Sequence, residues 1–588
     1  MRIAVIDYDK CKPKKCDSLC IKYCPRVRMG DETIVMDKKI GKPVISEELC
    51  VGCGICVHKC PFDAIHIENL PEELENPVYQ YGKNSFRLYR LPIPKEKHVL
   101  GIMGSNGIGK TTALRVLSSE IEPNFGDWTV EELDEEKVRE CFRGTELQKY
   151  FEKLKTGAKA IIKPQYIDRI PKRVSGTVAE IIEKTDEKGI SKELAKKLDM
   201  ENCLEREIKN LSGGELQRLA IIAAITREGD IYYFDEPSSH LDIYQRLNVA
   251  RSIRKLADKK TVIVVEHDLA ILDYLSDYVH IFYGKPGVYG IVSSPIGVRV
   301  GINTYLDGYL KDENVRFRPE TIEFDVHGAY EPPLGNVILE YPKLRKEFKD
   351  FTLSAEDGTL HEQEIIGIIG PNATGKSTFV KMLAGVEEPD NTAVKTELKV
   401  SYKPQYIKRD FNGTIKQLLR SVGGDESGYY KSKIIDPLSL EKILDSKVTE
   451  ISGGELQRVA IAVCLSRDAD IYLLDEPSAY LDIEQRLNMA KLIRRKMKAD
   501  EKCALVVEHD IVIVDYISDR TIVFSGEPGA RGTASQPLYI REGMNSFLKN
   551  VKITFRRDYD TKRPRANKLD SQLDRKQKSD GEYYYVKK

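Results

Sequence analysis

The chain has 588 residues, too many for a single hydrophobic core, so we expect three or four domains. Charged residues make up 31% and hydrophobic residues 41%, and 92 basic residues balance 92 acidic ones, which gives no overall reason to expect nucleic acid. No stretch approaches the roughly 18–20 apolar residues of a membrane helix. The N-terminal sequence MRIAVIDYDKCKPKKC lacks the apolar core of a signal peptide, so we expect a cytoplasmic protein without a membrane partner.

Eight cysteines stand in two runs of four within the first 60 residues, and each run ends in Cys-Pro. The second run, C-x2-C-x2-C-x3-C-P, has the spacing that holds a [4Fe–4S] cluster in bacterial ferredoxins, and the first is a looser C-x4-C-x3-C-x3-C-P. In this arrangement the first three thiolates of a run bind one cluster and the fourth binds the other. The sequence therefore predicts a ferredoxin-like α+β domain over residues 1–74 with two [4Fe–4S] clusters, one on Cys50, Cys53, Cys56 and Cys24 and the other on Cys11, Cys16, Cys20 and Cys60.

Zinc sites and disulfides are the alternatives for these cysteines. Zinc ligands usually come as two Cys-x2–4-Cys pairs separated by a longer loop, and exposed cluster thiolates indicate a reducing compartment. Four further cysteines stand singly and are interpreted as ordinary buried residues: Cys141, Cys203, Cys464 and Cys503.

The rest of the chain contains an internal repeat. The motifs KPQY, SGGELQR and DEPS each recur after 240 residues, and VVEHD recurs after 242. Two homologous domains are therefore expected over residues 75–295 and 335–537, followed by hinge segments at 296–334 and 538–588. The motifs GSNGIGKT at Gly104 and GPNATGKS at Gly370 lie 266 residues apart, so the first copy carries 26 additional residues (266 minus 240) within 130–156.

This insertion is predicted to be a helix-loop-helix. Its helices are expected over Glu131–Phe142 and Thr145–Lys155, with Thr145 and Gln148 forming a capping box. Apolar residues at i, i+3, i+4 and i+7 form one face of the second helix: Leu147, Tyr150, Phe151 and Leu154.

Each copy opens with an apolar strand, VLGIMG or IIGIIG, that runs into G-x4-GK-[ST], the P-loop whose backbone N–H groups surround phosphates at a helix N-terminus. Lys110 and Lys376 are expected to reach the β- and γ-phosphates of ATP, and Thr111 and Ser377 to bind Mg²⁺. The other predicted phosphate-binding residues are Gly104, Asn106, Gly107, Gly109 and Thr112 in the first copy and Gly370, Asn372, Gly375 and Thr378 in the second.

Two further apolar strands, IYYFDEP and IYLLDEP, end in Asp-Glu. Asp235 and Asp475 suit the Mg²⁺-linked Walker B role, and Glu236 and Glu476 stand where a carboxylate can polarise the attacking water.

Together these motifs resemble the ATP-binding-cassette (ABC) ATPases. LSGGELQR and ISGGELQR are similar to the family signature, Gln165 and Gln405 to its Q-loop, SSHLD and SAYLD to its D-loop, and His267 and His509 to its switch histidine. The resemblance implies that two cassettes face each other head to tail and bind two ATP molecules, with the Q-loop glutamines at ATP and Mg²⁺. The signature residues that would complete the γ-phosphate sites are Ser212, Gly213 and Gly214, and Ser452, Gly453 and Gly454.

Aromatic residues upstream of each P-loop are candidates for stacking on adenine, as in the A-loops of this family. They are Tyr81 and Phe86 for the first site and Tyr341 for the second.

Tandem cassettes without a membrane segment exclude a self-contained transporter, and the 108 residues from Gly104 to Ser212 leave no room for the long coiled coil of a repair ATPase. A redox-coupled soluble ABC ATPase, acting on DNA or on an iron–sulfur assembly partner, remains an alternative. The chain offers no flavin, haem or substrate motif for that role.

The whole arrangement resembles subfamily E of the ABC proteins, the RNase L inhibitor or ribosome-recycling family, and the lack of a eukaryote-style extension favours an archaeal source. The resemblance implies ATP-driven splitting of ribosomes into subunits, with structural clusters and a monomeric chain that stays on the small subunit. Expected partners are the small subunit, through rRNA and ribosomal proteins, a peptide-release factor or its rescue paralogue, and initiation factors.

Two basic segments are predicted hinges between the cassettes, near Pro295–Glu320 and Leu538–Arg565. From Arg541 to Lys588 the chain has 14 basic and 7 acidic residues, so contact with rRNA phosphate is a second expectation for the tail. A solvated linker is the alternative interpretation of both segments.

Overall fold

The structure, a computed structural model, describes residues 2–8, 10–37, 40–46, 49–69, 76–129, 138, 141–318, 320–324, 334–392, 398–405, 407, 409–425 and 427–584. The chain divides into two compact units. The first consists of Met1–Glu96, Ile102–Ala160 and Val279–Ile296, and the second consists of Lys97–Gly101, Ile161–Tyr278 and Gly297–Lys588.

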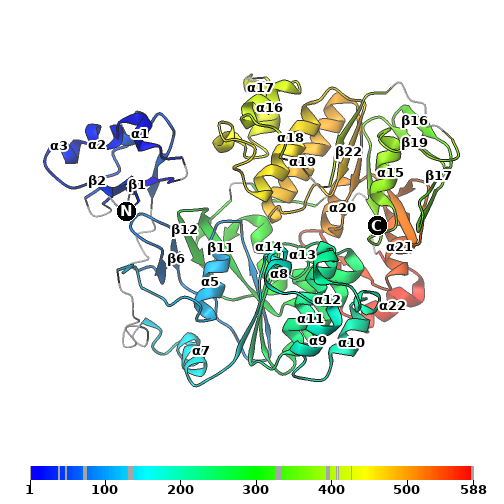
Figure 1. The fold of residues 1–588 in the computed structure, drawn as a ribbon, viewed down its shortest axis with the longest axis horizontal. Coiled ribbons are helices and arrows are strands. Elements are labelled where there is room, and N and C mark those ends of the chain that lie inside the picture. The colour runs from blue at the N-terminus through cyan, green and yellow to red at the C-terminus, as the bar shows by residue number, and fades with distance from the viewer. Residues whose placement is uncertain are drawn as a thin grey trace. The chain divides into compact units, whose positions relative to one another are not determined.

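The N-terminal domain of the first unit combines two small antiparallel sheets with short helices (Figure 1, blue). Strand β1 (Arg2–Ile6) pairs with β4 (Ile65–Asn69), and β2 (Ile34–Asp37) pairs with β3 (Lys42–Ile45). The helices are α1 (Pro13–Cys16), α2 (Leu19–Tyr23), α3 (Pro25–Arg28) and α4 (Ile55–Lys59). Because such short helices bury little apolar surface, the buried cysteines Cys20, Cys24 and Cys56 complete the core beside the isoleucines. The predicted ferredoxin-like α+β domain is confirmed.

The rest of the first unit holds the strands β5 (Tyr79–Gln80), β6 (Arg87–Tyr89), β12 (Tyr289–Val292) and β11 (Tyr278–Lys285). Strand β6 pairs with β5 antiparallel and with β12 parallel, and β12 pairs with β11 antiparallel. Strand β7 (Val99–Met103) leads to the P-loop helix α5 (Lys110–Leu117).

The second helix of the insertion is confirmed as α7 (Glu146–Lys155), with Leu147, Tyr150 and Phe151 buried. The first predicted helix, Glu131–Phe142, falls almost entirely outside the described residues. The predicted capping box is wrong, because the Thr145 hydroxyl donates to the Phe142 carbonyl (2.7 Å) instead of capping α7. Cys141 is exposed, contrary to expectation, whereas its neighbour Phe142 is buried; the other three single cysteines are buried as predicted.

The second unit contains the remainder of the first cassette and the whole second cassette. Its first-cassette strands include β8 (Ala160–Lys163), β9 (Ile231–Asp235) and β10 (Thr261–Val265), with β9 and β10 parallel. The helices of this part are α8 (Ile170–Arg173), α9 (Val178–Thr185), α10 (Ser191–Lys197), α11 (Gly213–Thr226), α12 (Ile243–Ala257), α13 (Leu269–Leu275) and α14 (Val298–Asp307). A short β14–β15 hairpin (Tyr309–Leu310 and Val315–Arg316) follows α14.

The second cassette is built on a sheet in the order β17-β18-β25-β24-β20-β23-β22-β21, and β26 (Leu538–Tyr539) pairs with β24. The strands are β17 (Leu344–Glu347), β18 (Thr352–Ala355), β20 (Ile365–Ile369), β21 (Val400–Lys403), β22 (Ile471–Asp475), β23 (Cys503–Val507), β24 (Arg520–Glu527) and β25 (Arg531–Ala534). A separate pair, β16 (Val337–Tyr341) and β19 (Gly358–His361), precedes β20. The helices are α15 (Lys376–Leu383), α16 (Ile415–Ser421), α17 (Gly428–Tyr430), α18 (Gly453–Ser466), α19 (Ile483–Asp500), α20 (Ile511–Ile517) and α21 (Ile540–Asn550).

The central strands β20, β22 and β23 are parallel and consist of the nearly continuous apolar runs IIGII, IYLLD and CALVV. All fifteen positions are buried, as expected for parallel strands covered on both faces. Because parallel strands end at the same edge, the residues that follow β20, β22 and β23 are brought together there. The predicted α/β organisation with two cassettes is confirmed.

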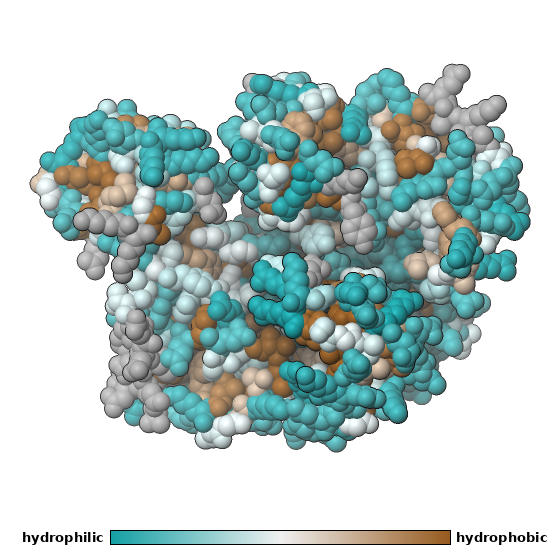
Figure 2. Space-filling model, in the orientation of Figure 1, coloured by the Kyte–Doolittle hydropathy of each residue, from teal (hydrophilic) through white to brown (hydrophobic). Residues whose placement is uncertain are grey.

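The surface on the face shown in Figure 2 is mostly hydrophilic, with small, separate hydrophobic areas. Among the residues that the structure describes, no helix is long and apolar enough to cross a membrane.

Candidate functional site

The two P-loops have the same backbone geometry. Gly370 (φ 151°) lies against Phe524, where an added Cβ would come within 2.5 Å of the phenylalanine Cβ, and Gly104 (φ 152°) lies against Phe282 in the same way. Only glycine therefore fits at the strand-to-loop turn. The Lys376 Nζ donates to the carbonyls of Gly370 (2.9 Å) and Pro371 (2.7 Å), and Lys110 makes the equivalent bonds in the first unit.

A buried carboxylate at the end of β22 fits a bound cation. Asp475 is 1% exposed, and neither of its carboxylate oxygens has a hydrogen-bond partner among the described residues. Burial raises its pKa, which the nearby Ser377 hydroxyl only partly offsets. Since an uncompensated buried carboxylate is costly, Mg²⁺ held by Asp475 and Ser377 together with ATP would satisfy this donor set.

The next residue, Glu476, is held by the Q-loop and the switch histidine. Gln405 Nε2 donates to its Oε1 (2.8 Å), and His509 Nε2 lies 3.3 Å from the same oxygen. Burial alone would raise the pKa of Glu476, but His509, Gln405 and Lys376 lower it to about 2. The carboxylate is therefore ionised at neutral pH and able to accept a hydrogen bond from water.

The first cassette repeats this constellation within the second unit. Gln165 Nε2 donates to Glu236 Oε1 at 2.6 Å, and His267 Nε2 lies 3.6 Å from it. The structure thus brings together the three predicted residues of each cassette: the Q-loop glutamine, the glutamate and the histidine. In both copies the glutamate backbone has φ 47°, a conformation that side-chain-bearing residues rarely adopt.

The signature and the D-loop are in contact within each cassette. Ser212 and Ser452 cap α11 and α18 in capping boxes with the glutamate three residues on. A Cβ on Gly214 would lie 2.9 Å from the His240 carbonyl of the D-loop, and the second cassette repeats this with Gly454 and Tyr480 at 3.0 Å. The third signature residue must therefore be glycine for this close approach.

The first cassette's D-loop also contacts the second cassette's P-loop. Asp242 Oδ2 accepts a hydrogen bond from the Asn372 backbone N–H (2.8 Å), while its Oδ1 caps α12 through the Gln245 N–H (2.9 Å). The His240 and Tyr480 rings of the two D-loops lie edge to face at 5.7 Å. One carboxylate therefore joins a helix of one cassette to the phosphate-binding loop of the other.

The aromatic candidates differ from the expectation in the second cassette. Tyr81 is 49% exposed, its hydroxyl lies 3.1 Å from the Thr112 hydroxyl, and the Phe86 ring packs on Gly109. Tyr341, by contrast, is 2% exposed and packs against Phe379 in the core. The prediction that its ring stacks on adenine is wrong, because neither face is accessible.

The β17–β18 hairpin offers other candidates for the adenine-stacking role that was predicted for Tyr341. Tyr81 and Phe86 lie between β5 and β6, and Phe348 and Phe351 lie between β17 and β18 in the same relation to the P-loop. The Phe351 ring packs on Gly375 as Phe86 packs on Gly109, and Phe348 is 44% exposed. Sequence analysis missed this pair, because the two hairpin loops differ in length and each phenylalanine lies one residue from the position that Tyr81 or Phe86 has when counted back from the P-loop.

The cysteines of the N-terminal domain line two hollows in the crossed grouping that the sequence predicts. One hollow is lined by Cys11, Cys16, Cys20 and Cys60, and the other by Cys24, Cys50, Cys53 and Cys56. The N–H groups of Ala4 and Ala64 point to the sulfurs of Cys50 and Cys60 (both 3.4 Å), as in iron–sulfur sites, where backbone donors bind the thiolates. Four thiols around each hollow fit a [4Fe–4S] cluster.

Comparisons with known proteins agree with this geometry. The family model described as "ABC transporter" matches residues 93–239 and 353–479, "Possible Fer4-like domain in RNase L inhibitor, RLI" matches 1–32, and "4Fe-4S binding domain" matches 43–66. An uncharacterized ABC transporter ATP-binding protein of Methanocaldococcus jannaschii is 58% identical over 100% of this chain and 98% of its own length. Translation initiation factor RLI1 of Saccharomyces cerevisiae is 48% identical over 100% and 98%.

Among solved structures, the chain is similar to one titled "Model of ribosome-bound archaeal Pelota and ABCE1", with 56% identity, a TM-score of 0.92 and coverage of 100% of this chain and 99% of that one. A complex of archaeal ribosomal stalk protein aP1 with the recycling factor aABCE1 gives 55% identity, a TM-score of 0.84 and coverage of 88% and 100%.

This chain belongs to the RNase L inhibitor (ABCE) family of ABC proteins. The predicted family and its ATP-hydrolysing cassettes are thereby confirmed, and so is a 4Fe–4S domain at the N-terminus.

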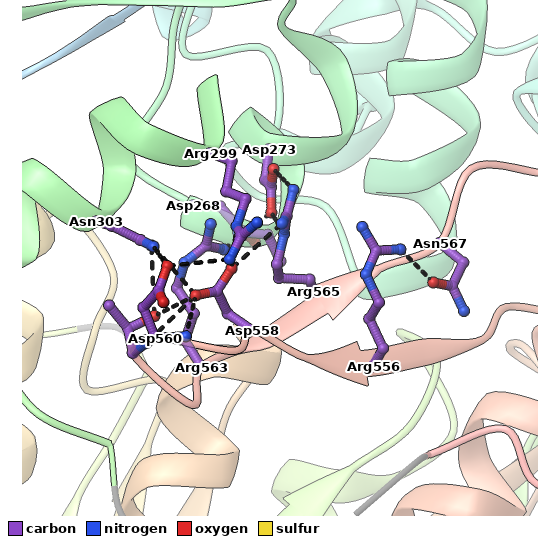
Figure 3. Close-up of polar contacts among 12 residues, drawn as sticks. Asp268, Asp273, Arg299, Asn303, Arg556, Asp558, Asp560, Arg563, Arg565 and Asn567 are labelled. Atoms are coloured by element: carbon purple, nitrogen blue, oxygen red, sulfur yellow. Dashed lines mark hydrogen bonds and ion pairs between the residues drawn. The ribbon is translucent and has the colours of Figure 1, made fainter. Parts of the chain in front are cut away.

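In this ABCE-family chain the C-terminal segment contacts both cassettes. Strands β27 (Phe555–Arg557) and β28 (Pro564–Ala566) form a hairpin, followed by α22 (Gln572–Asp580). Arg565 binds Asp273 of α13 through two hydrogen bonds (2.6 and 2.8 Å), and Arg563 Nη1 binds the same carboxylate at 2.9 Å (Figure 3). The aspartate belongs to the first cassette and the arginines to the tail.

The same hairpin binds the second cassette. Arg557 Nη2 donates to Asp515 of α20 at 2.6 Å, and the Tyr584 hydroxyl donates to the same carboxylate. Asp273 and Asp515 are 242 residues apart, the offset of the VVEHD repeat, so two equivalent aspartates receive the hairpin. The hinge role of this segment stays a prediction. Arg557, Arg563 and Arg565 are engaged by these aspartates inside the protein rather than presented to rRNA.

A third aspartate, Asp558, connects the hairpin to α14. Its side chain accepts from Asn303 Nδ2 (3.1 Å) and pairs with Arg299 (3.1 Å) and Arg565 (3.2 Å) (Figure 3). Burial alone would raise its pKa, but hydrogen bonds from the Thr561 backbone and Asn303 lower it well below its usual range. A lowered folded-state pKa stabilises the fold above the unfolded value near pH 4, and this contribution is lost as the pH falls through the folded value.

Removing the charge of Asp273 should destabilise the hinge. Asp273→Asn leaves buried Arg563 without its carboxylate, and breaking a buried pair in this way costs about 3–5 kcal/mol. Asp560→Asn is the matched control, because Asp560 is 60% exposed in its pair with Arg299 and should change stability by less than about 1 kcal/mol. Hydrogen exchange of the β27 and β28 amides and the melting temperature measure the difference. Equal behaviour of the two variants would contradict the assignment.

Proposed function

We propose that this chain is an ATP-driven ribosome-recycling factor of the cytoplasm, which splits ribosomes into subunits after termination or rescue and remains on the small subunit. The observation that carries the proposal is the full-length match, at 56% identity and TM-score 0.92, to a relative in a structure described as ribosome-bound with Pelota. The proposed partners are the small subunit, a Pelota-like or release factor, the ribosomal stalk and initiation factors, which the names of the related proteins and complexes support.

In the proposed cycle the cassettes close head to tail on two ATP molecules. The P-loop lysines bind the β- and γ-phosphates, Asp235 and Asp475 hold Mg²⁺ with Thr111 and Ser377, and the signature of the opposite cassette completes each site. Contact between Asp242 and the P-loop residue Asn372 supports this arrangement. We further propose that Tyr81 and Phe86 stack on adenine at the first site, and Phe348 and Phe351 at the second.

We propose three domains, over residues 1–74, 75–295 and 335–537, connected by hinges at 296–334 and 538–588. Closure of the cassettes moves the N-terminal domain, whose two [4Fe–4S] clusters hold its short helices together. The hairpin held by Asp273 and Asp515 serves as the pivot, since it binds the same position of both cassettes.

The catalytic roles of Glu236 and Glu476 can be tested by Glu→Gln substitution. The amide keeps the shape but lacks the charge that polarises water, so ATP binding should persist while hydrolysis falls roughly 10²-fold or more in the double variant. That variant should stay closed on ATP and remain bound to the small subunit in sucrose-gradient sedimentation. Undiminished ATPase activity would reject the assignment of the glutamates.

The crossed cluster ligation predicts reciprocal effects of two substitutions. Anaerobically purified protein should hold about eight iron and eight sulfide ions, and Cys24→Ser and Cys60→Ser should each lose about half. Because Cys24 lines the hollow of Cys50, Cys53 and Cys56, its loss should expose those thiols to alkylation while Cys11 stays protected. Mass spectrometry of alkylated peptides reads this pattern. Two zinc ions without sulfide, or exposure of the sequence neighbours instead, would disprove it.

We also propose that the helix-loop-helix docks on the ribosome, since one cassette alone carries it and neither ATP site needs it. Arg143 and Lys149 are exposed near α7. Replacing 131–155 with a short Gly-Ser linker should leave ATP binding intact but weaken small-subunit association and abolish splitting.

Arg143→Glu should weaken ribosome binding in part, and the defect relative to the unsubstituted protein should shrink at higher salt, because a protein with fewer phosphate contacts loses affinity less steeply as salt rises. Lys196→Glu on α10 is a charge-matched control at an exposed position outside the insertion. Light scattering of ribosomes with ATP and release factor measures splitting. A deletion variant that folds, binds ATP and splits at the normal rate would show that the insertion has no docking role.

A further inference from the structure

Each cassette buries a lysine directly behind its Walker B glutamate. Lys163 ends β8 and Lys403 ends β21, both are 1% exposed, and they are related by the 240-residue repeat. Among the described residues neither ammonium is within ion-pair distance of a carboxylate; each donates to backbone carbonyls instead. Burying an ammonium is costly, and the carboxylates near Lys163, those of Asp235, Glu236 and Glu266, offset only part of that cost, as do their counterparts near Lys403. An apolar side chain would fill the same space at lower cost.

The carbonyls involved are those on either side of the glutamate Cα. Lys163 Nζ donates to the carbonyls of Asp235 (2.9 Å) and Glu236 (3.3 Å). Lys403 Nζ makes the same two bonds at 2.7 and 3.2 Å. These carbonyls belong to the two peptide units that meet at the glutamate Cα, so fixing both sets its φ and ψ, and with them the direction in which the carboxylate leaves the backbone.

The glutamate backbone needs such support. Its φ of 47° in both cassettes lies in the left-handed region, which costs a side-chain-bearing residue free energy unless the surroundings hold it. Its own N–H is bound to the neighbouring strand, by the carbonyl of Val265 in the first cassette and of Val507 in the second (2.9 and 3.0 Å). The carbonyl side is held by the lysine.

A third element reaches the same carbonyl. Gln217 Nε2 donates to the Glu236 carbonyl at 2.7 Å, and Gln457 Nε2 to the Glu476 carbonyl at 2.7 Å. Both glutamines are buried in the signature helices, one turn after the signature glycines. The strand that carries the lysine leads, two residues later, to the Q-loop glutamine that binds the same glutamate's carboxylate.

We propose that Lys163 and Lys403 are positioning residues for ATP hydrolysis: each lysine, with the signature-helix glutamine, clamps the backbone of the catalytic glutamate. The position of the carboxylate thereby depends on the signature helix and on the Q-loop strand of the same cassette. Movement of either element on closure changes the clamp and so the alignment of the attacking water. The inference rests on the proposed catalytic role of Glu236 and Glu476.

The test is the double variant Lys163→Met and Lys403→Met in the full-length protein. Methionine fills the space but donates no hydrogen bond, so the affinity for a fluorescent ATP analogue and the KM should stay within about twofold, while kcat falls about 10–100-fold. A loss of this size is expected when a reacting group is misplaced by an ångström or less. A parallel loss of ATP affinity would overturn the inference, because it would indicate general damage to the fold.

Lys188→Met is the matched control. Lys188 is a partly buried lysine of the same cassette that donates to the Ile225 carbonyl (2.6 Å) and the Tyr232 hydroxyl (2.7 Å), away from the Walker B strand end. It should lower the melting temperature without changing kcat. Equal kcat losses in the control and in the test variant would mean that only stability is affected.

Two further variants keep the inference testable should the lysine variant fold poorly. Gln217→Leu with Gln457→Leu removes the other donor to the same carbonyl and should also lower kcat at constant ATP affinity; unchanged kcat there counts against the clamp. In a Glu236→Gln, Glu476→Gln background the lysine substitutions should cause no further loss, and an additional loss would contradict action through the glutamates. If the Glu→Gln double variant has low ATPase activity and the Lys→Met double variant has full activity, the inference about the lysines alone is overturned. If the Glu→Gln double variant has full activity, the proposed function of the glutamates is overturned as well.

Discussion

The nucleotide chemistry depends on one topological constraint, the shared edge at which parallel strands end. In the second cassette the P-loop follows β20, Asp475 and Glu476 end β22, and His509 follows β23. Residues far apart in the chain are therefore within hydrogen-bond distance, as the 2.8 Å between Gln405 and Glu476, 71 residues apart, and the 3.3 Å between His509 and Glu476 show. Their apolar strands are buried on both faces, which holds these polar ends rigidly against one another.

Two sets of contacts connect the cassettes: one joins a D-loop to a P-loop, and the other joins the C-terminal hairpin to both cassettes. Asp242 binds the Asn372 N–H, so the loop that receives phosphate in one cassette is held by the helix cap of the other. The hairpin β27–β28 places arginines on Asp273 and Asp515, the same position in each copy. The D-loop contact and the hairpin contacts thus connect the second cassette with the part of the first cassette that lies in the same compact unit.

Several features followed from the sequence because they depend on local chemistry or on the repeat. The P-loops, the Asp-Glu strand ends, the crossed cysteine grouping and the apolar face of α7 needed only spacing and residue type. The failures involve packing between segments. Tyr341 looked like an A-loop residue, yet the β16–β19 pair turns it into the core, and Phe348 and Phe351 occupy the hairpin position instead. Thr145 looked like half of a capping box, yet its hydroxyl is bound by the preceding turn.

The sequence by itself determined the family, the two cassettes and the positions of the P-loop, Walker B and signature motifs, and it predicted the crossed grouping of the cysteines, since chemistry of this kind demands particular side chains at fixed spacing. Only the tertiary structure decided which basic residues of the C-terminal segment are buried, which aromatic rings are accessible, and that Lys163 and Lys403 donate to the carbonyls on either side of the Walker B glutamate Cα. The KPQY motif indicates a Q-loop, but it does not indicate that Lys163 donates to the carbonyls of Asp235 and Glu236, 72 and 73 residues away. Such contacts form between strands and helices that are distant in the sequence, so local sequence patterns do not predict them.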